Sequence, residues 1–454
     1  MGERVRDWLR LWFTFERRVG RREYLASGVG LALLKYAGDA LLVWTATGRL
    51  WTPADYLSPV HSVVSVRLAH APPYLLPAMA VWAVPFLWIG VSMSMRRALD
   101  AGTSAWTALL FFVPYLSYAF MAAMSVVPSD PSVRPVPEPR RPDDRRLPGA
   151  LLAVAAGAAV GLGMIALSVY TLASYGISLF LGTPFVVGAL TAFLFNRRYP
   201  ATMLETQEVV LMTLACTGGA LLATAAEGAL CLLMVLPLAV LLGALGAVLG
   251  RRIARHDPGP AAHAAIAVLV LPMSAAFDVG RPAAGFREVR SAVVVDAPPH
   301  VVWRHVVSFP PLPEPSALVF RMGIAYPQRA RLVGQGVGAV RYCVFSTGPF
   351  VEPITRWEPG RRLAFDVASQ PPALEEWSPY ARVTPPHLHD YFRARRGEFR
   401  LVPLPGGRTR LEGSTWYEMR IFPEAYWVLF ADALVARIHH RVLEHVRSAA
   451  ESDG

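Results

Sequence analysis

Long apolar stretches decide what this chain can fold into. Between Gly149 and Phe195 there is no charged residue, and a run of this length is typical of membrane-spanning helices. Each span needs about 20 apolar residues, because every backbone amide inside a bilayer has to be bonded within its own segment. The chain has about eight such stretches, near 24–45, 73–95, 104–127, 149–171, 176–195, 208–226, 229–250 and 262–278. We therefore expect a multi-span α-helical membrane protein up to about residue 280.

Charge and composition favour the same location. The 454 residues are 54% hydrophobic and only 17% charged, whereas an average soluble domain has about 25% charged residues. The net charge of +11 comes with arginines that flank the apolar runs. Such arginines act as topology anchors, so we expect a membrane and no nucleic acid as partner. The three cysteines form no Cys-x-x-Cys pair, and we expect no disulfide framework, metal or cofactor.

Two short motifs surround the first apolar stretches. Phe15–Leu25 reads FERRVGRREYL, and Ile89–Trp106 reads IGVSMSMRRALDAGTSAW. Both resemble the bacterial inner-membrane family called domain of unknown function 805. The matching positions are Arg18, Arg21, Glu23, Tyr24, Arg96, Arg97, Asp100, Gly102, Ser104 and Trp106. The resemblance implies a three-span module over residues 1–127 in the inner (plasma) membrane, and no known chemistry.

Two pairs of charges in this module are spaced for ion pairs along a helix. Lys35 and Asp39 are four residues apart, as are Arg96 and Asp100, and residues at this spacing are neighbours on a helix surface. We expect both pairs to form.

A proline- and arginine-rich segment over 128–148 follows the first module. It cannot be helical, so we expect a semi-rigid linker. A second membrane module of about five spans is expected over 149–280. Its one charged residue between Val209 and Gly250 is Glu227, which suits either a hairpin turn or a functional carboxylate inside the membrane.

The arginine clusters give conflicting orientations. The positive-inside rule places the arginines at 17–22 and 96–97 in the cytoplasm, together with the N-terminus. Three spans would then put the linker outside, although the linker shares its side with the arginines at 197–198 and 251–255. Three solutions are possible. A further segment within 46–72 could cross the membrane, the stretch at 262–278 could be something other than a simple span, or the positive-inside rule could fail here. The side occupied by the C-terminal part stays open.

After Arg281 the pattern changes to alternating strands. An alternating stretch leads into DAPPHVVW and a short helix, and strand-like segments follow near 330–333, 338–346, 351–358, 361–368, 397–403 and 409–420. From Pro423 to about Ala450 no proline or glycine interrupts a helical pattern. This order favours an antiparallel meander crossed by a long helix.

The same residues resemble the START-like superfamily, also called SRPBCC or polyketide cyclase/lipid-transport proteins. Asp296, Ala297, Pro298, Val302 and Trp303 match its strand-to-helix motif. The resemblance implies that 281–454 is a C-terminal α+β helix-grip (START-like) domain with a cavity for an apolar ligand.

The candidate ligand contacts are polar or aromatic residues of the meander and of the long helix, with two histidines before the penultimate hairpin. They are Arg341, Tyr342, Glu352, Arg356, His387, His389, Trp416, Tyr417, Tyr426, Trp427 and Phe430. Core packing for the aromatics, and surface ion pairs for the arginines, are the alternative interpretations.

Our leading hypothesis is an integral membrane protein whose helix-grip domain binds a lipid or other hydrophobic small molecule near the bilayer, without catalysis. Tethering raises the effective concentration of such a ligand, while an interior filled by side chains would contradict the hypothesis. An enzyme of the cyclase, isomerase or hydrolase type, with His387, His389 or Glu352 as acid or base, is one alternative; no catalytic residue stands out. A sensory or assembly protein is another.

Overall fold

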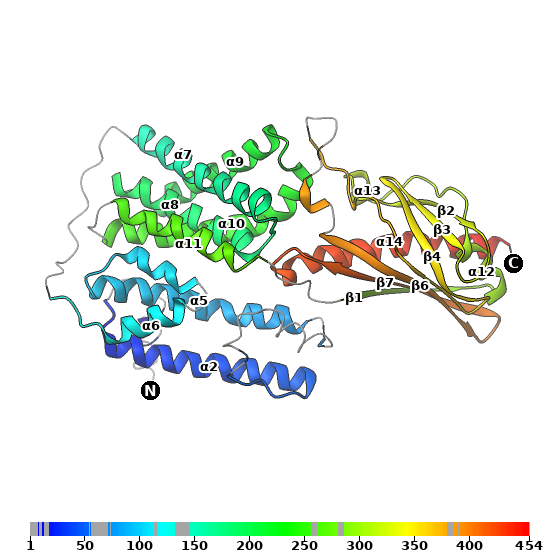
Figure 1. The fold of residues 1–454 in the computed structure, drawn as a ribbon, viewed down its shortest axis with the longest axis horizontal. Helices are drawn as coiled ribbons and strands as arrows, with labels where there is room; N and C mark the ends of the chain where they lie inside the picture. Colours follow the sequence, from blue (N-terminus) through cyan, green and yellow to red (C-terminus); the bar gives the residue numbers. More distant parts are fainter. Residues whose placement is uncertain are drawn as a thin grey trace. The chain divides into compact units, whose positions relative to one another are not determined.

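The computed structural model describes residues 8, 11–12, 18–53, 55, 71–72, 74–112, 116–131, 146–198, 200–256, 261–279, 286–378, 383, 385–388 and 391–453. The chain divides into two compact units. The first comprises Met1–Ala223 and Leu232–Arg281, and the second comprises Thr224–Cys231 and Pro282–Gly454. Figure 1 shows the elements of both units, which are described separately below.

The first unit begins with an antiparallel helix pair. Helix α2 (Arg21–Thr47) packs on α5 (Leu75–Asp100), and the hydroxyl groups of Tyr24 and Ser94 lie 2.8 Å apart near the start of one helix and the end of the other. The expected Lys35–Asp39 ion pair is present. The prediction that Arg96 pairs with Asp100 is wrong, because Arg97 pairs with this carboxylate at 2.8 Å. Arg96 instead donates to the Leu11 carbonyl.

The apolar stretch expected at 104–127 forms two short elements. The 3-10 helix η1 (Ala105–Phe112) and helix α6 (Leu116–Val126) pack on each other. Trp106 of η1 is fully buried, and its ring meets Phe193 edge-on at 5.1 Å.

The remaining helices of this unit follow the expected stretches. They are α7 (Arg146–Ile165) with the π-helical turn η2 (Ala166–Thr171), the π-helical turn η3 (Ser178–Gly182) with α8 (Thr183–Arg198), α9 (Met203–Ala223), α10 (Ala229–His256), and the 3-10 turn η4 (Ala261–Ala264) with α11 (Ala265–Ala276). The turn around Tyr175 and Gly176 lies between η2 and η3. Glu227 lies in the turn between α9 and α10, which agrees with the hairpin interpretation.

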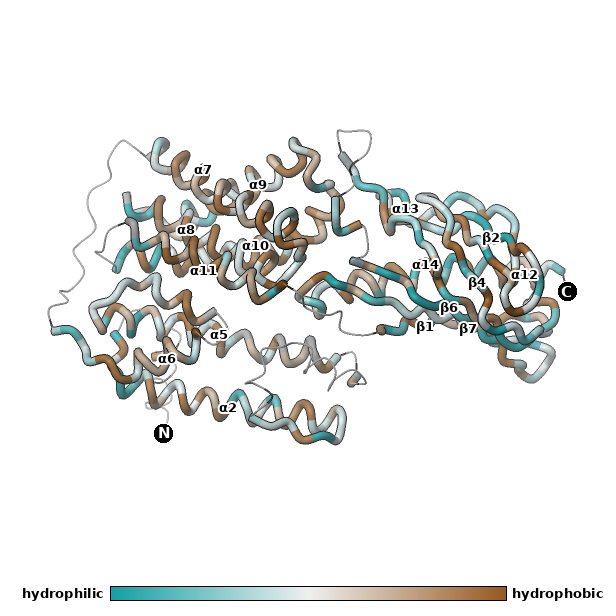
Figure 2. Tube along the Cα trace, viewed as in Figure 1, coloured by the Kyte–Doolittle hydropathy of each residue, from teal (hydrophilic) through white to brown (hydrophobic). Residues whose placement is uncertain are grey.

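Five helices among the described residues are long and apolar enough to cross a membrane: 21–47, 148–171, 178–197, 203–223 and 229–256. Large apolar side chains such as Leu33 and Leu241 are exposed on them, which suits contact with lipid. Figure 2 shows the apolar character of α7 to α11 along most of their length. The chain is a multi-pass membrane protein.

The second unit is built on a seven-stranded antiparallel sheet with the order β1-β7-β6-β5-β4-β3-β2. The strands are β1 (Arg287–Val295), β2 (Pro327–Val333), β3 (Val340–Phe345), β4 (Gly348–Glu358), β5 (Arg362–Asp366), β6 (Phe392–Leu404) and β7 (Arg408–Met419). Among the residues of this unit that the structure describes, three helices accompany the sheet: α12 (Pro299–Val307), α13 (Leu318–Arg321) and the long α14 (Glu424–Ser452). A 3-10 turn η5 (Pro386–Leu388) precedes β6.

One face of the sheet packs on α12 and α14. Val293 and Leu411 on the strands meet Val302 of α12 and Leu443 of α14 in one buried apolar cluster. Residues of alternating position along each strand point to this face, so the period-2 pattern of the sequence is the cause of the core. The expected helix-grip architecture is confirmed by this strand order and by the long helix across the sheet.

Candidate functional site

A groove of about 770 Å³ opens in the second unit between α13 and the segment that follows β5. Its apolar walls include Phe320, Ile324, Tyr326 and Trp377, and its polar groups include Glu314, Arg321, Glu375 and Glu376. The volume lies in the range of about 300–1,000 Å³ that is usual for small-molecule sites. None of the ten expected ligand contacts that the structure describes lines this groove.

A glycine fixes the floor of the groove. Gly323 has φ +110°, which side chains rarely allow, and a Cβ there would collide with the Glu375 carbonyl oxygen. The Gly323 carbonyl accepts from the Glu375 amide at 2.8 Å, and Ile324 pairs with Leu374. The close approach of the two segments therefore depends on the missing side chain.

One rim of the groove is bonded to the first turn of α10. The turn Thr224–Cys231 belongs to the same compact unit as the sheet. The Ala229 amide donates to the Trp377 carbonyl at 2.8 Å, and the Leu230 amide donates to Glu376 Oε2 at 3.1 Å. Gly228 allows this approach, because a Cβ there would collide with the Glu376 carboxylate. The groove thus adjoins residues 229–230 of α10, which belong to the same compact unit.

The sequence-predicted residues Arg341 and Glu352 meet inside the domain. They form an ion pair between neighbouring strands β3 and β4, with side chains only 2% and 7% exposed. The Arg341 Cζ atom lies 5.4–5.7 Å from the ring centres of Phe309, Phe365 and Phe399. Side chains therefore fill the interior around Arg341.

Burial changes the pKa values of Glu352 and of the neighbouring Cys343. Loss of solvent raises the pKa of Glu352, while the Arg341 charge opposes that rise. Burial, with the nearby Glu352 charge, also raises the pKa of Cys343 to about 12, so its thiol is inert in the folded domain. Arg341 Nε has no hydrogen-bond partner among the residues that the structure describes.

Three of the expected contacts lie away from that interior. Strand alternation places Tyr342 on the face opposite Arg341 and Trp416 on the face opposite Tyr417. Arg331 lies 4.9 Å from the Tyr342 ring centre, and Arg396 lies 4.9 Å from that of Trp416. Arg356 is half exposed and lies 3.6 Å from Glu358. The alternative of surface pairing fits Arg356.

The remaining aromatic candidates form two groups. Tyr417 is buried and donates its hydroxyl hydrogen to Asp432 Oδ1 at 2.7 Å; burial and the acceptor raise its pKa. Tyr426, Trp427 and Phe430 lie in the first turns of α14, with ring centres 5.3–6.2 Å apart.

Of the two histidines in PPHLHD, His387 lies in η5, and His389 is outside the described residues. The His387 side chain meets Cys231 and Glu227, which sequence reasoning did not connect with it.

The sequence pattern also gave no sign of a buried polar site under α14. His439 Nε2 lies 2.8 Å from Thr415 Oγ1, and Nδ1 lies 3.3 Å from Ser291 Oγ. Desolvation, helped by the His440 charge, lowers the pKa of His439 to about 4.

With this geometry established, known families can be compared with the two modules. Residues 12–135 match the family described as protein of unknown function (DUF805), and residues 287–451 match polyketide cyclase / dehydrase and lipid transport. Each match covers one module of the chain, the first in the membrane part and the second in the sheet domain. Both expected resemblances are confirmed. The match over 287–451 fits a ligand-binding or cyclase-type domain.

Curated proteins and solved structures say less about this chain than the two family matches do. No curated protein matches the chain. Solved structures similar to it include ZhuI aromatase/cyclase from Streptomyces sp. R1128 at 18% identity, covering 37% of this chain and 94% of that one, with a TM-score of 0.23. Norcoclaurine synthase from Thalictrum flavum is 12% identical, with 36% and 94% coverage and a TM-score of 0.23. Such low scores carry no argument about activity.

Proposed function

We propose that this protein binds an amphiphilic, mainly apolar small molecule in the groove of its helix-grip domain, next to the bilayer, without changing it chemically. The observation that carries the proposal is the bonding of the groove rim at Glu376 and Trp377 to the start of α10. Phe320, Ile324 and Trp377 give this groove apolar walls for a lipid-like molecule.

The lining favours a particular head group. Glu314 and Glu375 contribute carboxylates, and Arg321 is the one basic residue among the described residues that line the groove. Carboxylates disfavour an anionic ligand and favour a cationic or zwitterionic one. Phe320, Ile324 and Trp377 supply apolar contact for the rest of the molecule.

Hydrogen bonds within the first unit indicate which of its segments lie on the same side of the membrane. Segments 97–102 and 124–130 are directly bonded, because the Asp130 amide donates to the Asp100 carbonyl at 2.8 Å and Arg97 Nε donates to the Met124 carbonyl at 2.8 Å. Arg97 also donates to the Val127 carbonyl. The stretch between these two segments therefore begins and ends at the same depth in the membrane.

The lengths of its elements agree with a re-entrant hairpin. At about 2.0 Å per residue for a 3-10 helix and about 1.5 Å for an α-helix, η1 and α6 each extend about 16 Å. That is roughly half of a hydrocarbon core of about 30 Å. We infer two spans and a hairpin in place of three spans, so that the linker lies on the same side as Arg97.

Helix α11 is short, yet its contacts suit a full crossing. The η4–α11 pair covers 261–276. Asp278, just beyond it, accepts from the Ser178 amide at 2.7 Å, at the turn between α7 and α8. The chain thus leaves α11 at the end of the bundle opposite to Arg197 and Arg251.

With these assignments all arginine clusters share one side, and none of the three solutions suggested by the sequence is needed. Those clusters are at 17–22, 96–97, 134–146, 197–198 and 251–255. The α9–α10 turn then shares the other side with the C-terminal domain, which agrees with their membership of one compact unit. By the positive-inside rule we propose a cytoplasmic N-terminus in the bacterial inner membrane and a helix-grip domain on the outer face.

Reporter fusions at the C-terminus test the side. Alkaline phosphatase fused after Gly454 should be active, and green fluorescent protein at the same place should be dark. The opposite pair of results would refute the outer location.

Ligand binding is tested by native mass spectrometry of the full chain, released from detergent after incubation with zwitterionic and anionic lipids. We expect a bound zwitterionic lipid that is lost in Trp377→Glu. Leu429→Glu is the matched control, because it adds the same charge at an exposed apolar position of α14. Equal lipid binding by both variants would contradict the groove as the site.

A further inference from the structure

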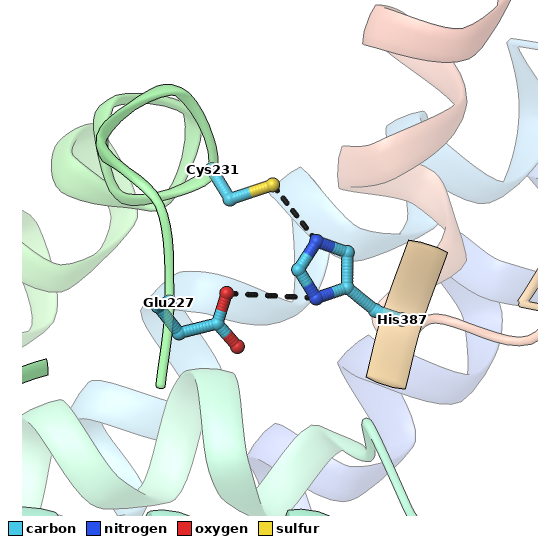
Figure 3. Close-up of side chains that lie close together, drawn as sticks. All are labelled: Glu227, Cys231 and His387. Carbon is cyan, nitrogen blue, oxygen red and sulfur yellow. Dashed lines mark hydrogen bonds and ion pairs between the residues drawn. The ribbon is translucent and has the colours of Figure 1, made fainter. Parts of the chain in front are cut away.

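Three metal-ligating side chains meet in the second unit, outside the groove. Glu227 comes from the turn after α9, Cys231 from the first turn of α10 and His387 from η5. Figure 3 shows the imidazole between the other two side chains: Cys231 Sγ lies 2.9 Å from His387 Nε2, and Glu227 Oε2 lies 3.5 Å from Nδ1. One ligand atom from each residue lies within 4.8 Å of the other two.

The surrounding chain holds these residues in place. The Glu376 carboxylate accepts from the amides of Leu230 and Cys231 at 3.1 and 3.4 Å, as a capping residue does at a helix start. The side chains of Glu227 and His387 are 12% and 10% exposed, and Cys231 is buried. The cluster is therefore a shielded site, unlike an exposed acidic patch.

We propose that Glu227, Cys231 and His387 bind a divalent transition-metal ion, with Zn²⁺ as the best match. Thiolate, imidazole and carboxylate are the three side-chain types that zinc uses, at about 2.0–2.3 Å. Ligand atoms around a tetrahedral ion with such bonds are about 3.3–3.8 Å apart. Small side-chain rotations bring the present atoms to that spacing, and one tetrahedral position stays open to water or to another ligand.

A nucleophilic cysteine is the competing interpretation, since a thiol, an imidazole and a carboxylate in a row also describe a catalytic triad. Two features favour the metal. The amides of Leu230 and Cys231, which would stabilise a developing oxyanion, are occupied by the Glu376 carboxylate. The Glu376 carboxylate is bonded to the Cys231 amide, and the Glu227 carboxylate lies within 4.8 Å of the Cys231 sulfur. Two acidic groups beside a thiol favour a bound cation over a free thiolate.

A metal here would join chain segments that are far apart in sequence. His387 lies 156 residues from Cys231, so the ion would fasten the α9–α10 turn to the C-terminal domain. This inference is independent of the proposed ligand, because the cluster residues do not line the groove.

The test uses the full chain in detergent, stripped with a chelator and titrated with Co²⁺. We expect about one equivalent to bind, with the near-ultraviolet charge-transfer absorption of a cobalt–thiolate bond, and Zn²⁺ should displace it. Cys231→Ser and His387→Ala should abolish the band, and Glu227→Gln should weaken binding by about tenfold or more. Cys216→Ser and His300→Ala, which change an exposed cysteine and an exposed histidine, are the matched controls.

A second measurement needs no variant. Peptide-resolved alkylation of Cys231 in the wild-type chain should slow by about tenfold or more when Zn²⁺ is added, while alkylation of Cys216 stays unchanged. A missing cobalt–thiolate band, a band that survives Cys231→Ser, or equal alkylation of Cys231 with and without zinc would overturn the inference.

Discussion

Replacing Glu352 by glutamine should destabilise the helix-grip domain strongly. The substitution leaves the Arg341 guanidinium as an unbalanced charge among three phenylalanine rings, with its side chain only 2% exposed. Breaking a buried ion pair by removing one partner costs about 3–5 kcal/mol. The glutamine oxygen still accepts one hydrogen bond, worth about 1 kcal/mol, so we expect the lower end, about 3 kcal/mol.

This cost corresponds to a large thermal shift. For a domain of this size class, 1 kcal/mol moves the midpoint of unfolding by about 2–4 °C, so Glu352→Gln should lower it by about 6–12 °C. The double variant Arg341→Met with Glu352→Met removes both charges. It should stay within about 1 kcal/mol of the wild type or exceed it, because desolvation offsets most of the attraction in such a pair.

Cys343 provides a specific assay. Its thiol is buried on β3, and its raised pKa of about 12 keeps it unreactive in the folded domain. A brief pulse of alkylating reagent at increasing temperature, followed by mass spectrometry of the Cys343 peptide, reports unfolding of this domain in the full-length protein. A shift below 2 °C in Glu352→Gln, or a double variant as unstable as the single one, would refute the reasoning.

Three further predictions concern other parts of the second unit. The pKa of His439 is about 4 in the folded state, against about 6.5 in the unfolded state. The unfolded state therefore binds protons first, and the free energy of unfolding should fall by up to about 3 kcal/mol as the pH drops from 6.5 to 4. The Cys343 assay should show a flatter dependence of stability on pH for His439→Gln. Gly323→Ala should cost about 2 kcal/mol or more through its positive φ and its collision with Glu375, and native mass spectrometry should show loss of lipid; normal stability with normal lipid binding would contradict this. Glu376→Gln should weaken capping of α10 by about 1 kcal/mol, seen as roughly fivefold faster hydrogen exchange at Leu230; unchanged exchange would argue against the cap.

The periodic parts of the fold were predictable from the sequence. Alternation along the strands and the uninterrupted pattern after Pro423 gave the sheet and α14, because side-chain period follows directly from backbone geometry. Alternation also separates Arg341 from Tyr342 and Tyr417 from Trp416, once the buried face of each strand is known. That face depends on packing with α14, which the sequence alone does not reveal.

Hydropathy carries little information on chain direction. The stretch at 104–127 is apolar enough for a span, but hydropathy contains no information on whether a chain crosses or turns back. The bonds from Arg97 and Asp100 to 124–130 are the observations on which the proposed hairpin rests. Arg97 and Asp100 of the motif thus act as tertiary contacts between chain segments.

The sites depend on contacts distant in sequence. The groove is assembled from loop residues near Gly323 and Glu375, which have no periodic pattern. Glu227 and Cys231 lie in an apolar region, far in sequence from His387. No rule of ligand spacing connects His387 with the other two residues. For this reason the histidine motif alone gave no metal prediction.

The most direct test of the central claim is to map where a bound lipid lies. A zwitterionic lipid with a photoreactive group in its acyl chain is incorporated with the full-length protein into vesicles, irradiated, and located by peptide mass spectrometry. We predict cross-links within 314–326 and 375–378, the segments that line the groove, and their loss in Trp377→Glu. Cross-links confined to the membrane helices, with none in these two segments, would contradict the account.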